Sequence, residues 1–326
     1  MTRMPPKVDI IVPHYKEEWE IGEKLFTIMN LQRGVDFRDF RVTVVNDGGN
    51  RIPEERFAGL KYEVRQIDIP HRGVSAARNA GVDAAEAEWI MFCDFDDMFA
   101  GIYALRDIMT VLPAENYDLL WAKMIAEDFT GGRETIYFTP EKQTFVFTHG
   151  KLYRLSWLRE NGVRFDETLN FQEDSLFNAV IIARMPYRRI GEIKTRMPMY
   201  IWIRRENSVT NSGREDEAVF STFIRNLKTT EENRLHRDYN SYCGMVTRTV
   251  WDTYHMIRGT RASAQIKRKI LDIFVPWITE RLDAFGVDDD IMRQIREISR
   301  EEFCDNDQTP DDPMTVRDWL HMTIKG

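Results

Sequence analysis

The sequence predicts an α/β protein with a mixed, mostly parallel sheet flanked by helices, followed by an all-helical C-terminal region. In the first two thirds of the chain, short apolar segments alternate with segments whose apolar residues recur at helical spacing. This order is typical of parallel strands joined by right-handed crossovers. Beyond about residue 213, helical spacing continues with few strand signals. We therefore predict two parts, residues 1–212 and residues 213–326.

The predicted strands are short, rich in Val, Ile and aromatic residues, and several end in proline or a turn signal. They comprise residues 8–13, 40–45, 62–67, 89–93, 117–122 and 200–203, with 136–138 and 144–147 as antiparallel strands beyond a polar turn at 127–133. Helices are predicted at residues 21–31, 71–81, 103–111, 152–158 and 175–183. In the C-terminal part, helical segments are 216–236, 240–258, 263–284 and 288–303, followed by an acidic loop at 304–313 and a short helix around Trp319.

The composition is typical of a globular protein with a sizeable core, since 43% of the 326 residues are hydrophobic and 30% are charged. A net charge of −8 provides no overall basic field for nucleic acid, although it leaves room for a local basic groove. Three widely spaced cysteines predict a reducing compartment without disulfides or a zinc site. The sequence shows no signal peptide and no segment of membrane-spanning length. We expect a cytoplasmic protein whose membrane contact, if any, is peripheral.

Carboxylates lie at the ends of successive predicted elements at three places, the last of which is a loop at residues 165–174. They are Asp47; then Asp94, Asp96 and Asp97; then Glu173 and Asp174. Because the carboxyl ends of parallel strands meet at one edge of a sheet, all three groups are expected to line a single crevice. An acid after a strand is otherwise an ordinary turn former or helix cap, so the spacing alone leaves both interpretations open.

Such a crevice suits displacement at a carbon that bears a diphosphate. Asp94 and Asp96, at alternate positions of a turn, could share Mn²⁺ or Mg²⁺, which would offset charge on the departing phosphate oxygens. Asp174 could take the proton from an incoming hydroxyl. Arg78 and Arg205 could bind phosphate oxygens through two N–H groups each, although by position alone Arg78 is more typical of a surface arginine paired with an acid.

The histidines indicate no particular chemistry. His14 and His71 flank predicted strand ends, where they could touch a ligand. The other four histidines are expected at the surface or at the edge of the core: His149, His236, His255 and His321. The sequence contains no Walker A loop, no Rossmann glycine fingerprint, no H-E-x-x-H and no G-x-S-x-G. Nucleotide hydrolysis on a P-loop and zinc-protease chemistry are therefore not indicated.

Seven motifs, in order, resemble those of the family 2 inverting glycosyltransferases, which have the GT-A fold. The family patterns VSVIVPxYN, VDDGS, NxGxxxARNxG, FLDxDD, GKLYRR, RFDE and GEDxxF are matched by residues 8–17, 44–49, 71–81, 92–97, 150–154, 164–167 and 172–177. Residues 205–210 resemble the segment that closes the donor site. Two departures occur within the motifs: Lys16 replaces an asparagine and Asn46 replaces an aspartate. The resemblance ends near residue 212.

The resemblance implies a role for each matched residue. Nucleotide contacts would come from Pro13, Tyr15, Glu17 and Asp47, and Asp47 would contact the base. Arg78 would lie beside the donor, Arg205 would contact the diphosphate, Asp94 would lie near the ribose or sugar and at the metal, and Asp96 would be the principal metal ligand. The catalytic residues would be Asp174, as the base, and Glu173. Asp97 would only support the turn. Lys16 would either contact a phosphate or point to solvent.

The predicted function is therefore metal-dependent, inverting transfer of a sugar from a nucleotide-diphosphate sugar, with UDP-sugars favoured, to an acceptor hydroxyl. A surface polysaccharide or a lipid-linked precursor is the expected acceptor, and a modified DNA base or a protein is the alternative within this class. A non-catalytic nucleotide-sugar-binding module is the alternative from another class. A sugar nucleotidyltransferase would need an early loop rich in glycine and lysine, which the sequence lacks. The helical region 213–326 is expected to bind the acceptor or to mediate self-association.

Overall fold

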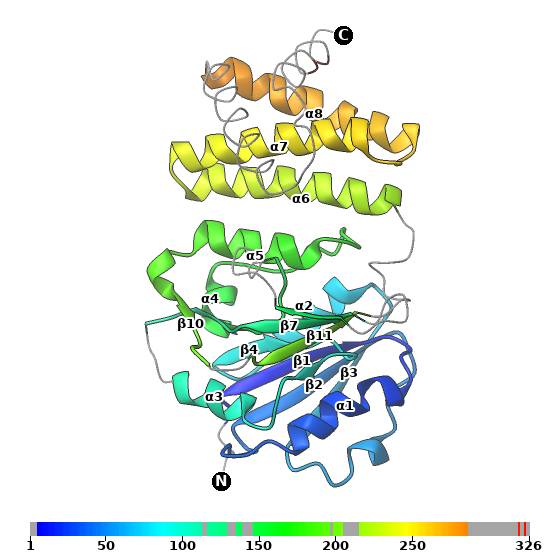
Figure 1. The fold of residues 1–326 in the computed structure, drawn as a ribbon, viewed down its shortest axis with the longest axis vertical. Helices are drawn as coiled ribbons and strands as arrows, with labels where there is room; N and C mark the ends of the chain where they lie inside the picture. The colour runs from blue at the N-terminus through cyan, green and yellow to red at the C-terminus, as the bar shows by residue number, and fades with distance from the viewer. Residues whose placement is uncertain are drawn as a thin grey trace. The chain divides into compact units, whose positions relative to one another are not determined.

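The computed structural model describes residues 5–112, 116–128, 135–138, 146–195, 198–204 and 215–285, together with residues 319 and 323. The chain divides into two compact units, Met1–Ser212 and Gly213–Gly326. The first unit contains two sheets with helices around them, and the described part of the second is helical (Figure 1). The role that the sequence suggested for each unit stays a prediction.

The main sheet of the first unit has seven strands. They are β1 (Val8–His14), β2 (Phe40–Asp47), β3 (Glu63–Ile69), β4 (Trp89–Phe92), β6 (Leu119–Trp121), β9 (Lys151–Arg154) and β10 (Ile190–Glu192), in the spatial order β10-β6-β9-β4-β1-β2-β3. Neighbouring strands are parallel except that β9 is antiparallel to both β4 and β6. The mostly parallel sheet predicted from the alternating pattern is confirmed.

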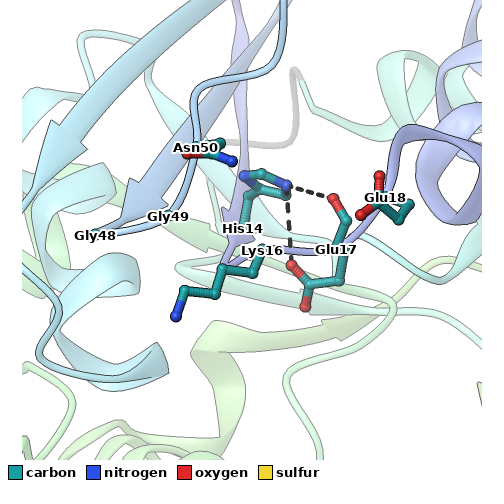
Figure 2. A pocket seen from close by; sticks show the side chains of 7 residues that line it. All are labelled: His14, Lys16, Glu17, Glu18, Gly48, Gly49 and Asn50. Atoms are coloured by element: carbon teal, nitrogen blue, oxygen red, sulfur yellow. Dashed lines mark hydrogen bonds and ion pairs between the residues drawn. The ribbon is translucent and has the colours of Figure 1, made fainter.

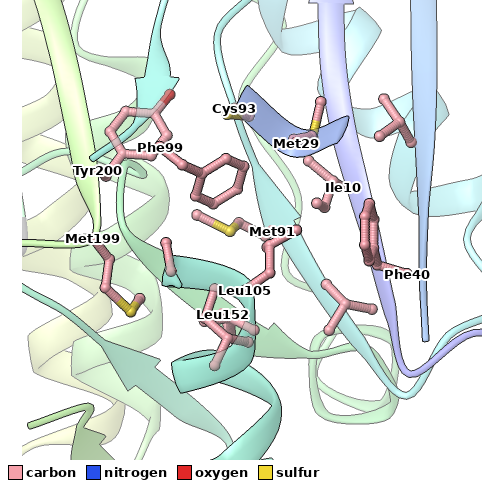
Figure 3. Packing of buried hydrophobic residues seen from close by; sticks show 14 of the residues in the cluster. Ile10, Met29, Phe40, Met91, Cys93, Phe99, Leu105, Leu152, Met199 and Tyr200 are labelled. Atoms are coloured by element: carbon pink, nitrogen blue, oxygen red, sulfur yellow. The ribbon is translucent and has the colours of Figure 1, made fainter. Parts of the chain in front are cut away.

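Helices cover both faces of this sheet, which explains why β1 is apolar at consecutive positions. On one face, Ile10 and Met91 pack with residues of α1 (Trp19–Asn30) and α3 (Ala104–Val111), as Figure 3 shows in part. On the other face, Ile11 packs with residues of α2 (Val74–Ala84), α4 (Leu155–Glu160) and α5 (Glu173–Arg184). Two short 3₁₀ helices, Glu54–Phe57 and Tyr187–Arg189, complete the connections.

A smaller sheet adjoins the carboxyl end of β4. Its strands are β5 (Met98–Phe99), β7 (Met124–Asp128), β8 (Thr135–Phe138) and β11 (Tyr200–Arg204), in the order β5-β11-β7-β8. β5 follows the acidic turn directly and pairs antiparallel with β11. This pairing brings a strand about one hundred residues away in sequence against the turn that carries Asp94 to Asp97.

Three details of the predicted elements are wrong. Residues 152–154 belong to strand β9, and only from Leu155 onward is the segment helical. Leu152 and Tyr153 are buried on opposite faces of the sheet, so the apolar run there has the two-residue period of a strand. Residues 127–128 lie in β7 instead of a turn, and Phe147 lies outside any strand. Segments 129–133, 139–145, 288–303 and 304–313 lie outside the described residues.

Close packing of α2 on β1 depends on Gly81. A Cβ atom added at this residue would lie 2.3 Å from Cγ2 of Ile11, a fully buried side chain. We expect Gly81→Ala to lower the free energy of unfolding by about 1–3 kcal/mol, because the helix must shift away from the sheet. Urea unfolding followed by circular dichroism measures the change. Gly101→Ala is the matched control, since no atom lies within 4 Å of the added Cβ; equal losses for the two variants would contradict this packing.

The second unit contains α6 (Glu215–His236), α7 (Tyr239–Gly259) and α8 (Ala264–Phe285). These helices share a core of their own that includes Phe223, Val250, Phe274 and Trp319. Asp238 caps α7 by accepting a hydrogen bond of 3.0 Å from the backbone N–H of Ser241. Within the described part of the chain, the helices are too short or too polar to cross a membrane.

Candidate active site

The candidate site lies where the parallel strands end. β1, β2 and β4 run in the same direction, so His14, Asp47 and the turn after Phe92 all lie at one edge of the sheet. Because β9 runs the opposite way, its first residues, beginning at Lys151, come to the same edge. Antiparallel insertion of β9 therefore adds residues 149–151 to the set expected from the parallel strands.

The acidic turn is held by hydrogen bonds to β11. Asp97 is fully buried; its Oδ1 accepts the Ile203 N–H at 2.8 Å and its Oδ2 accepts the Tyr200 hydroxyl at 2.8 Å. The Tyr200 hydroxyl also accepts the Asp94 N–H at 3.1 Å. Burial raises the pKa of Asp97 to about 8. These hydrogen bonds hold the turn against β11, which agrees with the supporting role suggested for Asp97.

Sequence reasoning missed His149, which lies at the centre of the site. Its ring is 5% exposed and stacks near Tyr200, with 5.2 Å between ring centroids. Nε2 lies 3.0 Å from Asp94 Oδ2 and 3.6 Å from Asp97 Oδ2. Burial lowers the pKa of His149, but the hydrogen bond and the charges of the two carboxylates raise it above its ordinary value. The expectation of a residue at the surface or at the core edge is wrong; its place just before the motif at 150–154 was the available signal.

The donor set at the turn fits a divalent cation. One ligand atom from each of Asp94, Asp97 and His149 lies within 4.8 Å of the other two. Carboxylate oxygens suit Mn²⁺ and Mg²⁺, and imidazole suits several transition metals. Asp96, the predicted principal ligand, is partly buried beside this group and is not among its three converging residues. The metal role of Asp96 stays a prediction.

Arg78 connects the acidic turn with the first turn of α5. Nη2 donates to Asp94 Oδ1 at 3.0 Å, and Nη1 donates to Glu173 Oε1 at 2.9 Å. Burial acts to raise the pKa of Asp94, but the Arg78 guanidinium and His149 hold it well below its usual range. Burial raises the pKa of Glu173 to about 7. The arginine is 4% exposed, so it is not the surface residue that its sequence position suggested; its contact with a donor stays a prediction.

Asp174 follows Glu173 in the same helical turn and has a different environment. Its Oδ1 accepts the N–H of Ser175 at 2.6 Å. Burial raises the pKa of Asp174, and Arg78 and His149 oppose that rise. Gln172, the residue just before α5, has the left-handed conformation with φ of 62°, which costs free energy for a residue other than glycine. Through Arg78, this turn is linked to Asp94, whose charge also acts on Asp174.

At the other end of the edge, an aromatic pair lies beside Asp47. Tyr15 and His71 stack with ring centroids 4.0 Å apart and an angle of 9°. Asp47 Oδ1 accepts the N–H of Arg72 at 2.7 Å, and Oδ2 accepts the N–H of Gly73 at 2.8 Å. Asp47 Oδ2 also lies 2.8 Å from His71 Nδ1. Asp47 thus anchors the loop before α2. Its predicted contact with a base would use an oxygen that already accepts a hydrogen bond.

A pocket of about 340 Å³ opens between the loops that follow β1 and β2 (Figure 2). It is lined by His14, Lys16, Glu17, Glu18, Gly48, Gly49 and Asn50. Glu17, a predicted nucleotide contact, accepts the Tyr15 N–H at 2.6 Å. Lys16 is exposed, with φ of 61°, and its Nζ lies 4.8 Å from the centroid of the Tyr15 ring. The cation that replaces the family's asparagine therefore lies at the pocket.

Asn46, the second departure from the family pattern, has a structural explanation. It is buried, with Oδ1 2.9 Å from His14 Nδ1, and its Nδ2 donates to Asp68 Oδ1 at 2.8 Å. An amide supplies both a donor and an acceptor, whereas an ionised aspartate would face the Asp68 carboxylate. Pro13, a predicted nucleotide contact, lies on β1 opposite Val45 and is partly buried. Arg205, the predicted diphosphate contact, lies outside the described residues.

Lys151, the first residue of β9, is a buried lysine. It is 1% exposed, and Nζ donates to the carbonyl oxygens of Phe147 and His149. Burial lowers its pKa from 10.5 to about 7, against the charge of Asp174. Between these values the unfolded chain binds more protons than the folded protein, so Lys151 makes stability rise with pH.

The Lys151 contribution should raise the free energy of unfolding by about 1 kcal/mol per pH unit between pH 7 and 10, and we expect Lys151→Met to lack this increase. Urea unfolding free energies of both proteins across this range measure the difference. Lys267→Met, at a lysine that also donates to a backbone carbonyl, is the control. Parallel curves for Lys151→Met and the parent protein would show that Lys151 keeps its proton in the fold.

Comparison with known proteins identifies the domain. The family described as "Glycosyl transferase family 2" matches residues 9–162. The chain contains a family 2 glycosyltransferase domain. The matched residues contain the acidic turn, Arg78 and β9, and the family 2 domain therefore contributes most of the crevice.

Curated relatives of the family 2 domain are bacterial. Poly(ribitol-phosphate) β-N-acetylglucosaminyltransferase TarS of Staphylococcus aureus is 28% identical over 185 residues, which are 52% of this chain and 31% of TarS. The uncharacterized glycosyltransferase EpsJ of Bacillus subtilis is 28% identical over 236 residues, 64% of each chain. The chain thus spans about a third of the length of TarS, the first of these relatives.

Solved structures show the same fold. S. aureus TarS 1–349 in complex with UDP-GlcNAc superposes with a TM-score of 0.66 at 21% identity, covering 85% of this chain and 83% of that one. The mannosyltransferase PcManGT of Pyrobaculum calidifontis, in complex with GDP-Man and Mn²⁺, has a TM-score of 0.53 at 13% identity and covers 98% of this chain and 84% of that one. The predicted GT-A fold is confirmed.

Proposed function

We propose that this protein is a metal-dependent, inverting glycosyltransferase that uses a nucleotide-diphosphate sugar. One observation carries the proposal: a single buried arginine joins Asp94, on the acidic turn, to the turn of α5 that carries Asp174. Two acidic groups on separate elements, one after β4 and one at the start of α5, are thereby linked to each other. This is the arrangement that a displacement needs, with a leaving group on one side and a proton acceptor on the other.

In the proposed reaction, Asp174 accepts the proton of the acceptor hydroxyl. The hydroxyl oxygen then forms a bond to the anomeric carbon, while the bond from that carbon to the diphosphate oxygen breaks and its electron pair leaves with the diphosphate. One displacement inverts the configuration. A divalent cation at Asp94 and Asp96, or at Asp94, Asp97 and His149, would offset charge on the diphosphate when bound.

The donor is proposed to carry uracil, and the acceptor to be a hydroxyl of a surface polysaccharide or a lipid-linked precursor. The relatives support this, since TarS was solved with UDP-GlcNAc and its name specifies a poly(ribitol-phosphate) acceptor. Tyr15 and His71 offer an aromatic surface at the base end of the site, where a nucleobase could stack. The helical unit is proposed to bind acceptor or a second copy, and the protein to work in the cytoplasm at a membrane surface.

Differential scanning fluorimetry with UDP-, GDP-, CDP- and ADP-sugars, with and without Mn²⁺, tests the donor and the metal together. We expect UDP-sugars to raise Tm, and Mn²⁺ to increase that shift. Turnover is then followed as release of UDP with short polyol-phosphate and glycan acceptors. Binding of a UDP-sugar without UDP release for any acceptor would favour the non-catalytic binding module, and no shift with any nucleotide sugar would contradict the proposal.

A further inference from the structure

Arg78 has contacts that fit it for positioning the two halves of the site. Its two terminal nitrogens donate to carboxylates from different elements, Asp94 after β4 and Glu173 at the start of α5. Its guanidinium also lies over the Phe165 ring, 5.3 Å from the centroid. The side chain is 4% exposed, so a donor molecule could reach little of it in this arrangement.

The neighbouring residue on α2 holds the loop that leads into α5. Asn79 Nδ2 donates to the Phe165 carbonyl at 3.0 Å and to Glu167 Oε1 at 2.9 Å, and its Oδ1 accepts the Phe165 N–H at 2.9 Å. Two consecutive residues of α2 therefore fix both the beginning of this loop and its end at Glu173. The rest of α5 is held by packing on the sheet, and Arg78 and Asn79 add the contacts at its first turn and at the loop before it.

Glu173 and Asp174 have different contacts, which gives them different roles. Glu173 is 12% exposed and bonded to Arg78, whereas the hydrogen bond to the Asp174 carboxylate comes from the adjacent Ser175. Burial raises the pKa of Glu173 to about 7, but its carboxylate is bonded to the Arg78 guanidinium, so a proton taken from an acceptor hydroxyl would weaken that ion pair. Asp174 keeps the function of proton acceptor.

We propose that Arg78 is a positioning residue: with Glu173 as its partner on α5, it sets the separation between the donor-side acid Asp94 and the base Asp174. This rests on the proposed function. It removes Glu173 from the catalytic residues and makes it the anchor through which Arg78 acts. Lysine cannot replace the arginine, because one ammonium group cannot make two planar hydrogen bonds to carboxylates on opposite sides.

A double-mutant cycle tests the proposal, with Arg78→Lys, Glu173→Gln and the pair measured for kcat, donor KM and Mn²⁺ affinity. We expect Glu173→Gln to lower kcat by about 10- to 100-fold while donor KM and Mn²⁺ affinity change less than about threefold, because only the base side is displaced. The double variant should be no slower than Arg78→Lys, since each change breaks the same link. Arg65→Lys, at a partly buried arginine that donates to Thr43 Oγ1 and the Ala84 carbonyl, is the control expected to keep kcat.

The outcomes separate the two levels of the proposal. An unmodified enzyme that binds no nucleotide sugar and releases no UDP would overturn the function itself. Two results with an active enzyme would overturn the positioning role alone. One is full kcat in Glu173→Gln, and the other is a double variant whose loss of kcat equals the product of the two single losses. Should Arg78→Lys fail to fold, Glu173→Gln still decides: a rise in donor KM with unchanged kcat contradicts the proposal, and a fall in kcat at constant KM supports it.

Discussion

Asp174→Asn is expected to lower kcat by about 10²- to 10⁴-fold, the range attributed to general-base catalysis, with little change in donor KM. The asparagine keeps the shape of the side chain and the hydrogen bond that Asp174 accepts from Ser175, but it cannot take a proton from an acceptor hydroxyl. Initial rates of UDP release at saturating donor and acceptor measure kcat. Asp83→Asn, at an exposed carboxylate on α2, is the matched control and should leave kcat unchanged.

The same substitution should stabilise the protein. Burial raises the pKa of Asp174, so between its ordinary and its raised value the folded protein binds more protons than the unfolded chain. Stability contributed by this group therefore falls as pH rises through that window. Asparagine has no such cost, and Tm of Asp174→Asn at neutral pH should equal or exceed that of the parent. A variant that is both inactive and less stable would indicate a structural residue instead of a base.

Asp94→Asn is expected to weaken Mn²⁺ binding by at least about tenfold, a loss seen even for residues outside the ligand set. Asp94 belongs to both ligand sets considered, the pair with Asp96 and the group with Asp97 and His149. The electron paramagnetic resonance signal of free Mn²⁺ during titration gives Kd without any need for turnover. Asp83→Asn again serves as the control, and unchanged Kd in Asp94→Asn would contradict a cation at this turn.

The choice between the two ligand sets follows from two further variants. If Asp96 is the principal ligand, Asp96→Asn should match the loss seen for Asp94→Asn, while His149→Gln has a small effect. If Asp94, Asp97 and His149 bind the ion, His149→Gln should weaken Mn²⁺ binding strongly and Asp96→Asn only slightly. Nitrogen hyperfine coupling to Mn²⁺ should then be present in the parent and absent in His149→Gln. These outcomes exclude one another.

Much of the fold followed from local patterns. Periodicity and turn signals predicted β1, β2 and β4 and the acids after them, because these features depend on residues near one another in sequence. The seven motifs identified the family. Strand β9 was not predicted, since its four residues merge into the apolar helix that follows, and a short apolar run does not specify its own partner. β5, with two residues, gave no signal.

The sequence by itself determined the family, the alternation of strands and helices and the positions of Asp94, Asp96 and Asp174 at the ends of elements. Only the tertiary structure decided which of these groups meet. It brought His149 to the acidic turn because β9 runs against its neighbours, and it buried Arg78 between carboxylates 16 and 95 residues away. Strand direction and long-range ion pairing depend on the packing of whole elements, which no local spacing encodes.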